Sequence, residues 1–284
     1  MLFKHALFVT AFVLAGGAAL AATAPAASPT TQPSAAASTT AAPLRLAKPP
    51  VRPKATAEER AEVERRDPLA RAAFWAREVD NDQTDNDARL KLAKALRALG
   101  RYEEAGENAD QLLVMQPTNY EALLESARDR IGQNQGFYAI DPAQRAEALQ
   151  PHDWRPVSLL AVALEQSERD SEALVAHKKA LALAPDNPAT LSNLGMYYAT
   201  HGDKTQAEAL LRRAAAAPGA GAQERQNLAL VLGLEGRFDE AEQLERQDLP
   251  PQAVDNNLAY LRAANDPAPA SGGDHTWSQV KAAQ

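Results

Sequence analysis

The sequence predicts an all-α solenoid, a right-handed superhelix of stacked antiparallel helix pairs. Two series of small residues and one series of prolines recur at an interval of 34 positions, the length of one two-helix unit. The small series of the first helices is Ala93, Ala127, Ala161, Gly195 and Ala229. The small series of the second helices is Ala105, Ala139, Ala173, Ala207 and Ala241. Pro117, Pro151 and Pro185 close three of the units in the same register.

Small residues belong where two helices cross, because only Gly or Ala lets the backbones approach closely. The stretch 188–221 shows the unit most clearly, with a first half and a second half that follow the skeleton of a tetratricopeptide repeat. Its marker residues are Leu191, Leu194, Gly195, Tyr198, Ala207, Leu211, Ala214 and Pro218. We therefore predict five repeats, at residues 86–119, 120–153, 154–187, 188–221 and 222–250.

The N-terminus has the parts of a secretory signal, which we predict over residues 1–21. Lys4 precedes an apolar run, and Ala19-Leu20-Ala21 offers a cleavage site. The alternative is an uncleaved membrane anchor, for which the apolar run is short. Residues 22–55 are rich in Ala, Pro and Thr, which predicts a disordered linker. Such a linker could tether the folded part to an envelope surface or simply clear the secretion channel.

Residues 56–85 are predicted to form helices that cap the stack, with Thr56 and Asp67 as N-caps. Phe74 and Trp75 fit core packing better than a binding platform. The acidic run from residue 80 to 87 lacks the glycine and glutamate positions of a calcium-binding loop, so turn and N-cap chemistry explains it better.

The second repeat is irregular, because residues 133–138 replace the ordinary turn between its helices. Two interpretations stay open: a tolerated deviation, or a place where a partner docks. After the fifth repeat, residues 251–264 predict a helix that covers the last apolar face of the solenoid. The content of Pro, Gly and Ser in residues 265–284 predicts a disordered tail.

Composition and motifs argue against several functions. The net charge of −7 disfavours a nucleic-acid binder, which would need a basic face. No catalytic or phosphate-binding motif is present, so we predict neither an enzyme, a small-molecule substrate nor a cofactor. The histidines lack metal-ligand spacing, and His177 fits a core position. The chain has no cysteine, which excludes disulfides and thiolate metal sites. An enzyme with an unrecognised site stays the remote alternative.

The first helices of such repeats line a concave wall, and side-chain amides on that wall can bond the backbone of an extended peptide. Asn193, Asn227 and Asn257 share one local pattern, each followed by Leu and a small residue. Gln223 and Gln226 fall on the same wall. We predict a groove in the C-terminal half that binds an extended segment of a partner protein. The equal alternative is that these amides are solvated surface groups. Chaperone adaptors built from such repeats bind a C-terminal carboxylate with a clamp of lysine and asparagine side chains. That clamp is missing from this sequence.

The C-terminal third has further sequence features: Asn193-Leu194-Gly195, the run from Gln226 to Phe238, Asp248-Leu249-Pro250-Pro251, and the run from Asn256 to Arg262. Gly136-Phe137-Tyr138 and Asp153-Trp154-Arg155-Pro156 precede them in the middle repeats. Over roughly residues 86–263 the chain resembles the TadD-type tetratricopeptide proteins of the tight-adherence (Tad/Flp) pilus assembly system.

That resemblance implies an envelope protein that supports assembly of the outer-membrane secretin and fibre export through protein contacts. Members of the group are typically lipoproteins, whereas this chain has Gly17 where the lipidated cysteine would stand. We therefore expect a soluble periplasmic protein whose membrane association, if any, runs through its partners. A general periplasmic adaptor, for example a regulator of cell-wall enzymes, is the alternative.

Overall fold

The computed structural model describes residues 53–265, and within them the chain forms thirteen helices and no strand. The helices are α2 (Ala57–Val63), α3 (Pro68–Asn81), α4 (Asn86–Ala98), α5 (Tyr102–Met115), α6 (Tyr120–Gly132), α7 (Gly136–Leu149), α8 (Trp154–Gln166), α9 (Asp170–Leu183), α10 (Pro188–Thr200), α11 (Lys204–Ala216), α12 (Ala222–Leu234), α13 (Phe238–Glu245) and α14 (Pro251–Asn265). The predicted all-α solenoid is therefore confirmed. The predicted signal (1–21), nearly all of the linker (22–55) and the tail beyond residue 265 lie outside the described residues. None of the helices in residues 53–265 is long and apolar enough to cross a bilayer.

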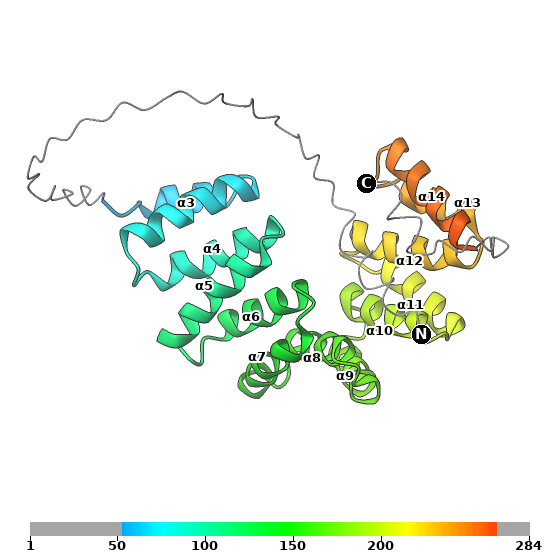
Figure 1. Ribbon diagram of the computed structural model, residues 1–284, viewed down its shortest axis with the longest axis horizontal. Helices are drawn as coiled ribbons and strands as arrows, with labels where there is room; N and C mark the ends of the chain where they lie inside the picture. Colours follow the sequence, from blue (N-terminus) through cyan, green and yellow to red (C-terminus); the bar gives the residue numbers. More distant parts are fainter. Residues whose placement is uncertain (1–52, 266–284) are drawn as a thin grey trace, which may run out of the picture.

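The helix pairs follow one another along an arc (Figure 1). Each pair consists of a first helix (α4, α6, α8, α10 or α12) and the second helix that follows it. The first helices lie toward the inside of the arc and the second helices toward the outside (Figure 1). Each first helix also contacts the first helix of the next pair. We call the surface of the first helices the inner wall and that of the second helices the outer wall.

The N-cap residues of the first helices recur with the same period as the helix pairs. A side-chain oxygen at the N-cap accepts a hydrogen bond from a backbone N–H of the first turn, which satisfies a donor that the helix leaves unpaired. These N-caps of the first helices are Asp85, Asn119, Asp153 and Asn187. In the fifth pair Gly221 takes this place, and its backbone N–H donates to Glu224 instead. Asp85, which belongs to the acidic run of residues 80–87, is therefore a helix cap.

The turn inside each pair needs one residue with left-handed backbone geometry. The φ angles are 74° at Gly100, 57° at Asn134, 58° at Glu168, 84° at Gly202 and 81° at Gly236. Glycine adopts this geometry without strain, while Asn tolerates it better than most side chains. The second repeat thus keeps the ordinary turn geometry with Asn134 in place of glycine, although its sequence there looks irregular.

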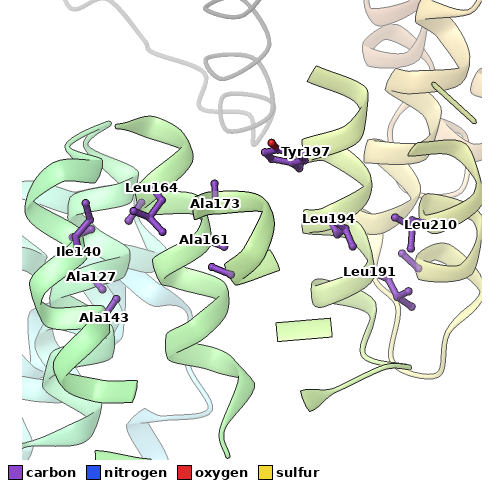
Figure 2. Close-up of a cluster of buried hydrophobic side chains, with 14 residues drawn as sticks. Ala127, Ile140, Ala143, Ala161, Leu164, Ala173, Leu191, Leu194, Tyr197 and Leu210 are labelled. Atoms are coloured by element: carbon purple, nitrogen blue, oxygen red, sulfur yellow. The ribbon is translucent and has the colours of Figure 1, made fainter. Parts of the chain in front are cut away.

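The small residues lie where the helices cross, as the periodicity predicts. Figure 2 shows the buried apolar cluster that runs through α6 to α11. Ala127, Ala139, Ala161 and Ala173 are fully buried in it, and Leu164 and Leu194 fill the space between pairs. At Gly195 an added Cβ would lie 2.8 Å from Cγ of Leu211. The helices α10 and α11 therefore approach closely at this position, and an alanine there would displace the Leu211 side chain.

Both ends of the solenoid are covered by helices that add apolar side chains. At the N-terminal end Trp75 of α3 is fully buried, and its Nε1–H donates to Glu64 at 2.9 Å. At the C-terminal end Val254 and Leu258 of α14 pack on the last pair. Leu261 of α14 packs against Gly233, where a Cβ would come within 2.4 Å of its Cδ1. Such covers keep the terminal apolar faces of a repeat stack away from water.

Candidate binding surface on the inner wall

The C-terminal half of the inner wall carries two equivalent hydrogen bonds between neighbouring repeats. Nδ2 of Asn193 on α10 donates to Oγ of Ser158 on α8, at 2.9 Å. Nδ2 of Asn227 on α12 donates to Oγ of Ser192 on α10, also at 2.9 Å. Each bond joins the same two positions of successive repeats. Ser158 and Ser192 carry no sequence feature that marks them, and only this regular pairing reveals their role.

The two asparagines differ in what they can still offer to a partner. Asn193 is half-buried, and its Oδ1 makes no hydrogen bond with any described residue. Asn227 is only 8% exposed, and its Oδ1 accepts a hydrogen bond from Nε2 of Gln223 at 2.9 Å. Asn227 is thus largely committed to holding α10 and α12 together. Gln223 is the exposed member of the three hydrogen-bonded side chains Gln223, Asn227 and Ser192.

The other predicted groove residues are placed differently. Gln226 lies on α12 and is half-buried. Asn257 lies on α14, where its Nδ2 is 3.3 Å from Oε1 of Glu245 on α13. Glu245 is buried, and that burial raises the pKa of its carboxyl group. The structure therefore brings Asn193, Gln223, Gln226 and Asn227 onto neighbouring helices, while Asn257 stabilises the C-terminal cover.

The N-terminal half of the inner wall is held by ion pairs instead of amides. Glu121 on α6 contacts Nζ of Lys94 at 2.9 Å on one side and Arg155 on α8 at 3.2 Å on the other. Burial alone would raise the pKa of Glu121, but Lys94 and Arg155 hold it below its usual value. These three side chains link three successive repeats, and all of them are partly exposed to solvent.

Two more carboxyl groups of α6, those of Glu125 and Asp129, are buried. Glu125 is fully buried and pairs with Arg97 at 2.8 Å and with Arg128 at 2.6 Å. Asp129, one turn further along, is also fully buried, and neither of its oxygens has a hydrogen-bond partner among the described residues. Burial, followed by the charge of Glu125, raises the pKa of Asp129 to about 8.

His177 is buried in the core, as the sequence predicts, with Nε2 3.3 Å from Oε2 of Glu165. Within residues 53–265 no group of three metal-ligating side chains could hold a metal ion. What the inner wall offers is a row of amide, hydroxyl and charged groups along adjacent helices.

Comparisons with known proteins agree with this architecture. Residues 189–217 match one model of the tetratricopeptide repeat, and residues 87–110 and 227–247 match another. The comparison with curated proteins found no match.

Solved structures show the same fold at low sequence identity. A thermophilic tetratricopeptide-repeat protein of Thermus thermophilus is 24% identical, with a TM-score of 0.58, and the match covers 63% of this chain and 99% of that one. A tetratricopeptide-repeat protein of Parabacteroides merdae is 12% identical, with a TM-score of 0.61 over 72% of this chain and 80% of that one. The chain therefore folds as a solenoid of tetratricopeptide repeats.

Proposed function

We propose that this protein is a non-catalytic scaffold of the bacterial cell envelope that binds an extended segment of a partner protein on its inner wall. The observation that carries the proposal is the row of polar side chains on α8, α10 and α12. The carbonyl oxygen of Asn193 has no hydrogen-bond partner there within residues 53–265, and Gln223 on the neighbouring α12 is exposed. An amide both donates and accepts, so it can pair with a peptide unit of an extended strand.

The system served is, in our proposal, the tight-adherence pilus machinery, with the secretin or another assembly protein as the partner. The sequence resemblance of residues 86–263 to TadD-type proteins supports this choice. We further propose that the protein is secreted across the inner membrane and is soluble in the periplasm. Cell fractionation checks this point, and recovery of the protein solely in detergent-extracted membranes would contradict it.

The test is an affinity capture from envelope extract with the secreted form of the chain, followed by mass spectrometry. The variant carries Asn193→Ala and Gln223→Ala, which remove the two amides of the inner wall on which the proposal rests. Asn227 is left intact, because its loss would disrupt the bond to Ser192. The matched control is Asn108→Ala, which removes an amide of the outer wall that bonds the α5 backbone.

Three outcomes separate the possibilities. Capture of a secretin or another pilus-assembly protein by the wild type and the control, but not by the variant, supports both the system and the inner wall. Capture by all three proteins keeps the pilus system and rejects the inner wall as the binding surface. Capture of cell-wall enzymes alone rejects the pilus system in favour of a general periplasmic adaptor.

A further inference from the structure

The second helix of the second repeat, α7, carries large apolar side chains at both ends of its exposed face. The exposed side chains along this face are Phe137, Tyr138, Asp141, Gln144, Arg145, Ala148 and Leu149, which we call the α7 face. Phe137 and Tyr138 are 71% and 61% exposed at one end, and Leu149 is 44% exposed at the other. Two opposite charges lie between these ends. Large apolar side chains that gather on a surface mark interaction sites.

The α7 face is complementary to itself under a two-fold rotation. In an antiparallel pair of identical helices, two residues face each other when they lie equally far from the crossing point. With the crossing at the level of Ala143, Asp141 of one helix faces Arg145 of the other. In the same arrangement Phe137 faces Leu149. Each contact then occurs twice, as an isologous interface requires.

The other second helices lack this symmetry. At the equivalent crossing level the opposed exposed pairs would be Glu103 with Met115 on α5, Val175 with Lys179 on α9 and Ala209 with Arg213 on α11. Each of these pairs would set a charged group against an apolar side chain, which costs free energy when the contact excludes water. Helix α13 is too short to form such a face. Self-complementarity is therefore a property of α7 and not of the repeat in general.

The charged groups beside α7 are already paired within the chain, so the surface favours neither an acidic nor a basic partner. These pairs are Arg130 with Asp110, Arg145 with Asp141 and Arg169 with Glu172. The net charge of −7 makes two copies of the chain repel each other as wholes. A neutral face is where such copies can meet. At the crossing, the two pairs of Asp141 and Arg145 form a ring of alternating charges.

The shape of the outer wall also suits a contact centred on one helix. This wall is the outside of the arc, and α7 lies near the middle of the arc, so a second copy would meet α7 first (Figure 1). A groove of about 620 Å³ between α5 and α7, lined by Val114 and Phe137, leaves space for side chains of the second helix. At Gly136 an added Cβ would lie 2.6 Å from the backbone oxygen of Ala163, so the start of α7 is held against α8.

We propose that the protein forms a two-fold dimer in which α7 of one copy packs antiparallel on α7 of a second copy. Phe137 of each copy packs on Leu149 of the other, and Asp141 and Arg145 exchange partners across the axis. The inner walls lie on the opposite sides of the two solenoids. The dimer therefore leaves both inner walls open, and it presents two copies of that surface.

Analytical ultracentrifugation of the secreted form, between about 1 and about 100 µM, measures this self-association. We expect an equilibrium between monomer and dimer. Phe137→Ala should weaken the dimer at least about tenfold, the loss expected for an aromatic anchor. The control Leu69→Ala removes an apolar side chain of similar exposure from α3 and should leave the dimer unchanged. Circular dichroism verifies that both variants are folded.

The charge pattern provides a test that a loss of folding cannot imitate. Asp141→Arg leaves only cations at the crossing, and Arg145→Asp leaves only carboxylates there. Each variant alone should dimerise at least about tenfold more weakly than the wild type, because like charges then face each other. An equimolar mixture of the two variants should regain the affinity of the wild type as a heterodimer. The double variant Asp141→Arg/Arg145→Asp should dimerise as the wild type does.

The chain has no cysteine, so Gln144→Cys adds a single thiol beside the crossing point. Its oxidation should link two copies, whereas Leu69→Cys should not. A monomer at every concentration would overturn the proposal, and so would a mixture of the charge variants that associates no better than either alone. A thiol-reactive cross-linker that joins Gln144→Cys only to a different envelope protein would also overturn it. Asn193→Ala should leave the dimer unaltered, which separates this test from that of the inner wall.

Discussion

The two halves of the inner wall join their repeats with different chemistry. In the N-terminal half, carboxylates of α6 pair with lysine and arginine side chains of α4 and α8. In the C-terminal half, asparagine amides pair with serine hydroxyl groups of the preceding first helix. Both sets bridge successive first helices, so they perform the same structural task. The ion pairs and the amide bonds differ, however, in how they respond to pH and to salt.

Ion pairs depend on pH and salt, whereas amide and hydroxyl groups keep one state across the physiological range. The N-terminal half also buries Asp129, which has no hydrogen-bond partner in the described part of the chain, at a position where the first and third repeats hold Ala95 and Ala163. A partner bound along the whole inner wall would therefore meet one half whose inter-repeat bonds depend on pH and one half whose inter-repeat bonds do not. Four experiments compare the two halves of the solenoid: the first concerns helix packing, and the other three concern this contrast in chemistry.

The largest effect on stability is expected from substituting glycines that lie at close helix–helix contacts. Gly136→Ala in the second repeat should cost about 2–3 kcal/mol of unfolding free energy, because its Cβ would meet the backbone oxygen of Ala163. Gly195→Ala in the fourth repeat should change stability by no more than about 1 kcal/mol. Its Cβ meets the Leu211 side chain, and the gain in helix propensity offsets part of the clash. Urea unfolding measures both, and equal losses would contradict the expected difference between a backbone contact and a side-chain contact.

The next effect concerns Asp129→Ala. Because burial and Glu125 raise the pKa of Asp129 to about 8, the folded state holds a proton that the unfolded chain releases near 3.8. The folded wild type therefore loses stability as pH rises from about 4 to about 8. The variant should be more stable than the wild type by on the order of 2 kcal/mol at pH 8, and by less at pH 5. Thermal unfolding at both pH values decides, and a pH-independent difference would refute the buried proton.

Asn227→Ala probes the C-terminal half and should cost about 1 kcal/mol, since it leaves Ser192 and Gln223 without their partner. The cost should be the same at pH 5 and pH 8, because neither group titrates. A double-mutant cycle with Ser192→Ala isolates the bond, with an expected coupling of about 0.5–1 kcal/mol. Asn108→Ala on the outer wall is the control, and a coupling of zero would show that the bond adds nothing.

The smallest effect is the salt dependence of the pairs around Glu121. These groups are partly exposed, so each pair contributes less than about 1 kcal/mol. Raising the salt from about 0.05 M to about 0.5 M should speed hydrogen exchange in α4 and α6 more than in α10. Lys94→Met should remove most of that response. A uniform response along the solenoid would contradict a difference between the halves.

Much of the fold could be predicted from the sequence, because a repeat protein uses the same local rules in each unit. The small residues such as Ala127 and Ala161, which recur with the period of the helix pairs, lie buried at helix crossings as expected. The sequence also indicates that residues 133–138 are unusual, and it favours a tolerated deviation over a place where a partner docks. The structure shows an ordinary turn geometry there, with Phe137 and Tyr138 exposed.

The candidate site could be predicted only in part. The sequence places Asn193 and Asn227 on the first helices, and the structure agrees. It cannot reveal that Asn227 is buried and bonded to Ser192, since that depends on how one repeat is rotated against the next. Asn257 shares the local pattern of the other two but lies on α14 and contacts Glu245. A shared pattern of three residues does not determine which neighbour a side chain meets.

The repeated helix pair follows from the sequence alone, because helix periodicity, N-caps and turn residues act over a few neighbouring positions. Which polar groups remain free, and where apolar side chains are left uncovered, depends on the tertiary structure. Those outcomes rest on contacts between residues about one repeat apart, as with Asn193 and Ser158. Burial is a property of the stacked assembly, so no single repeat contains the information that fixes it.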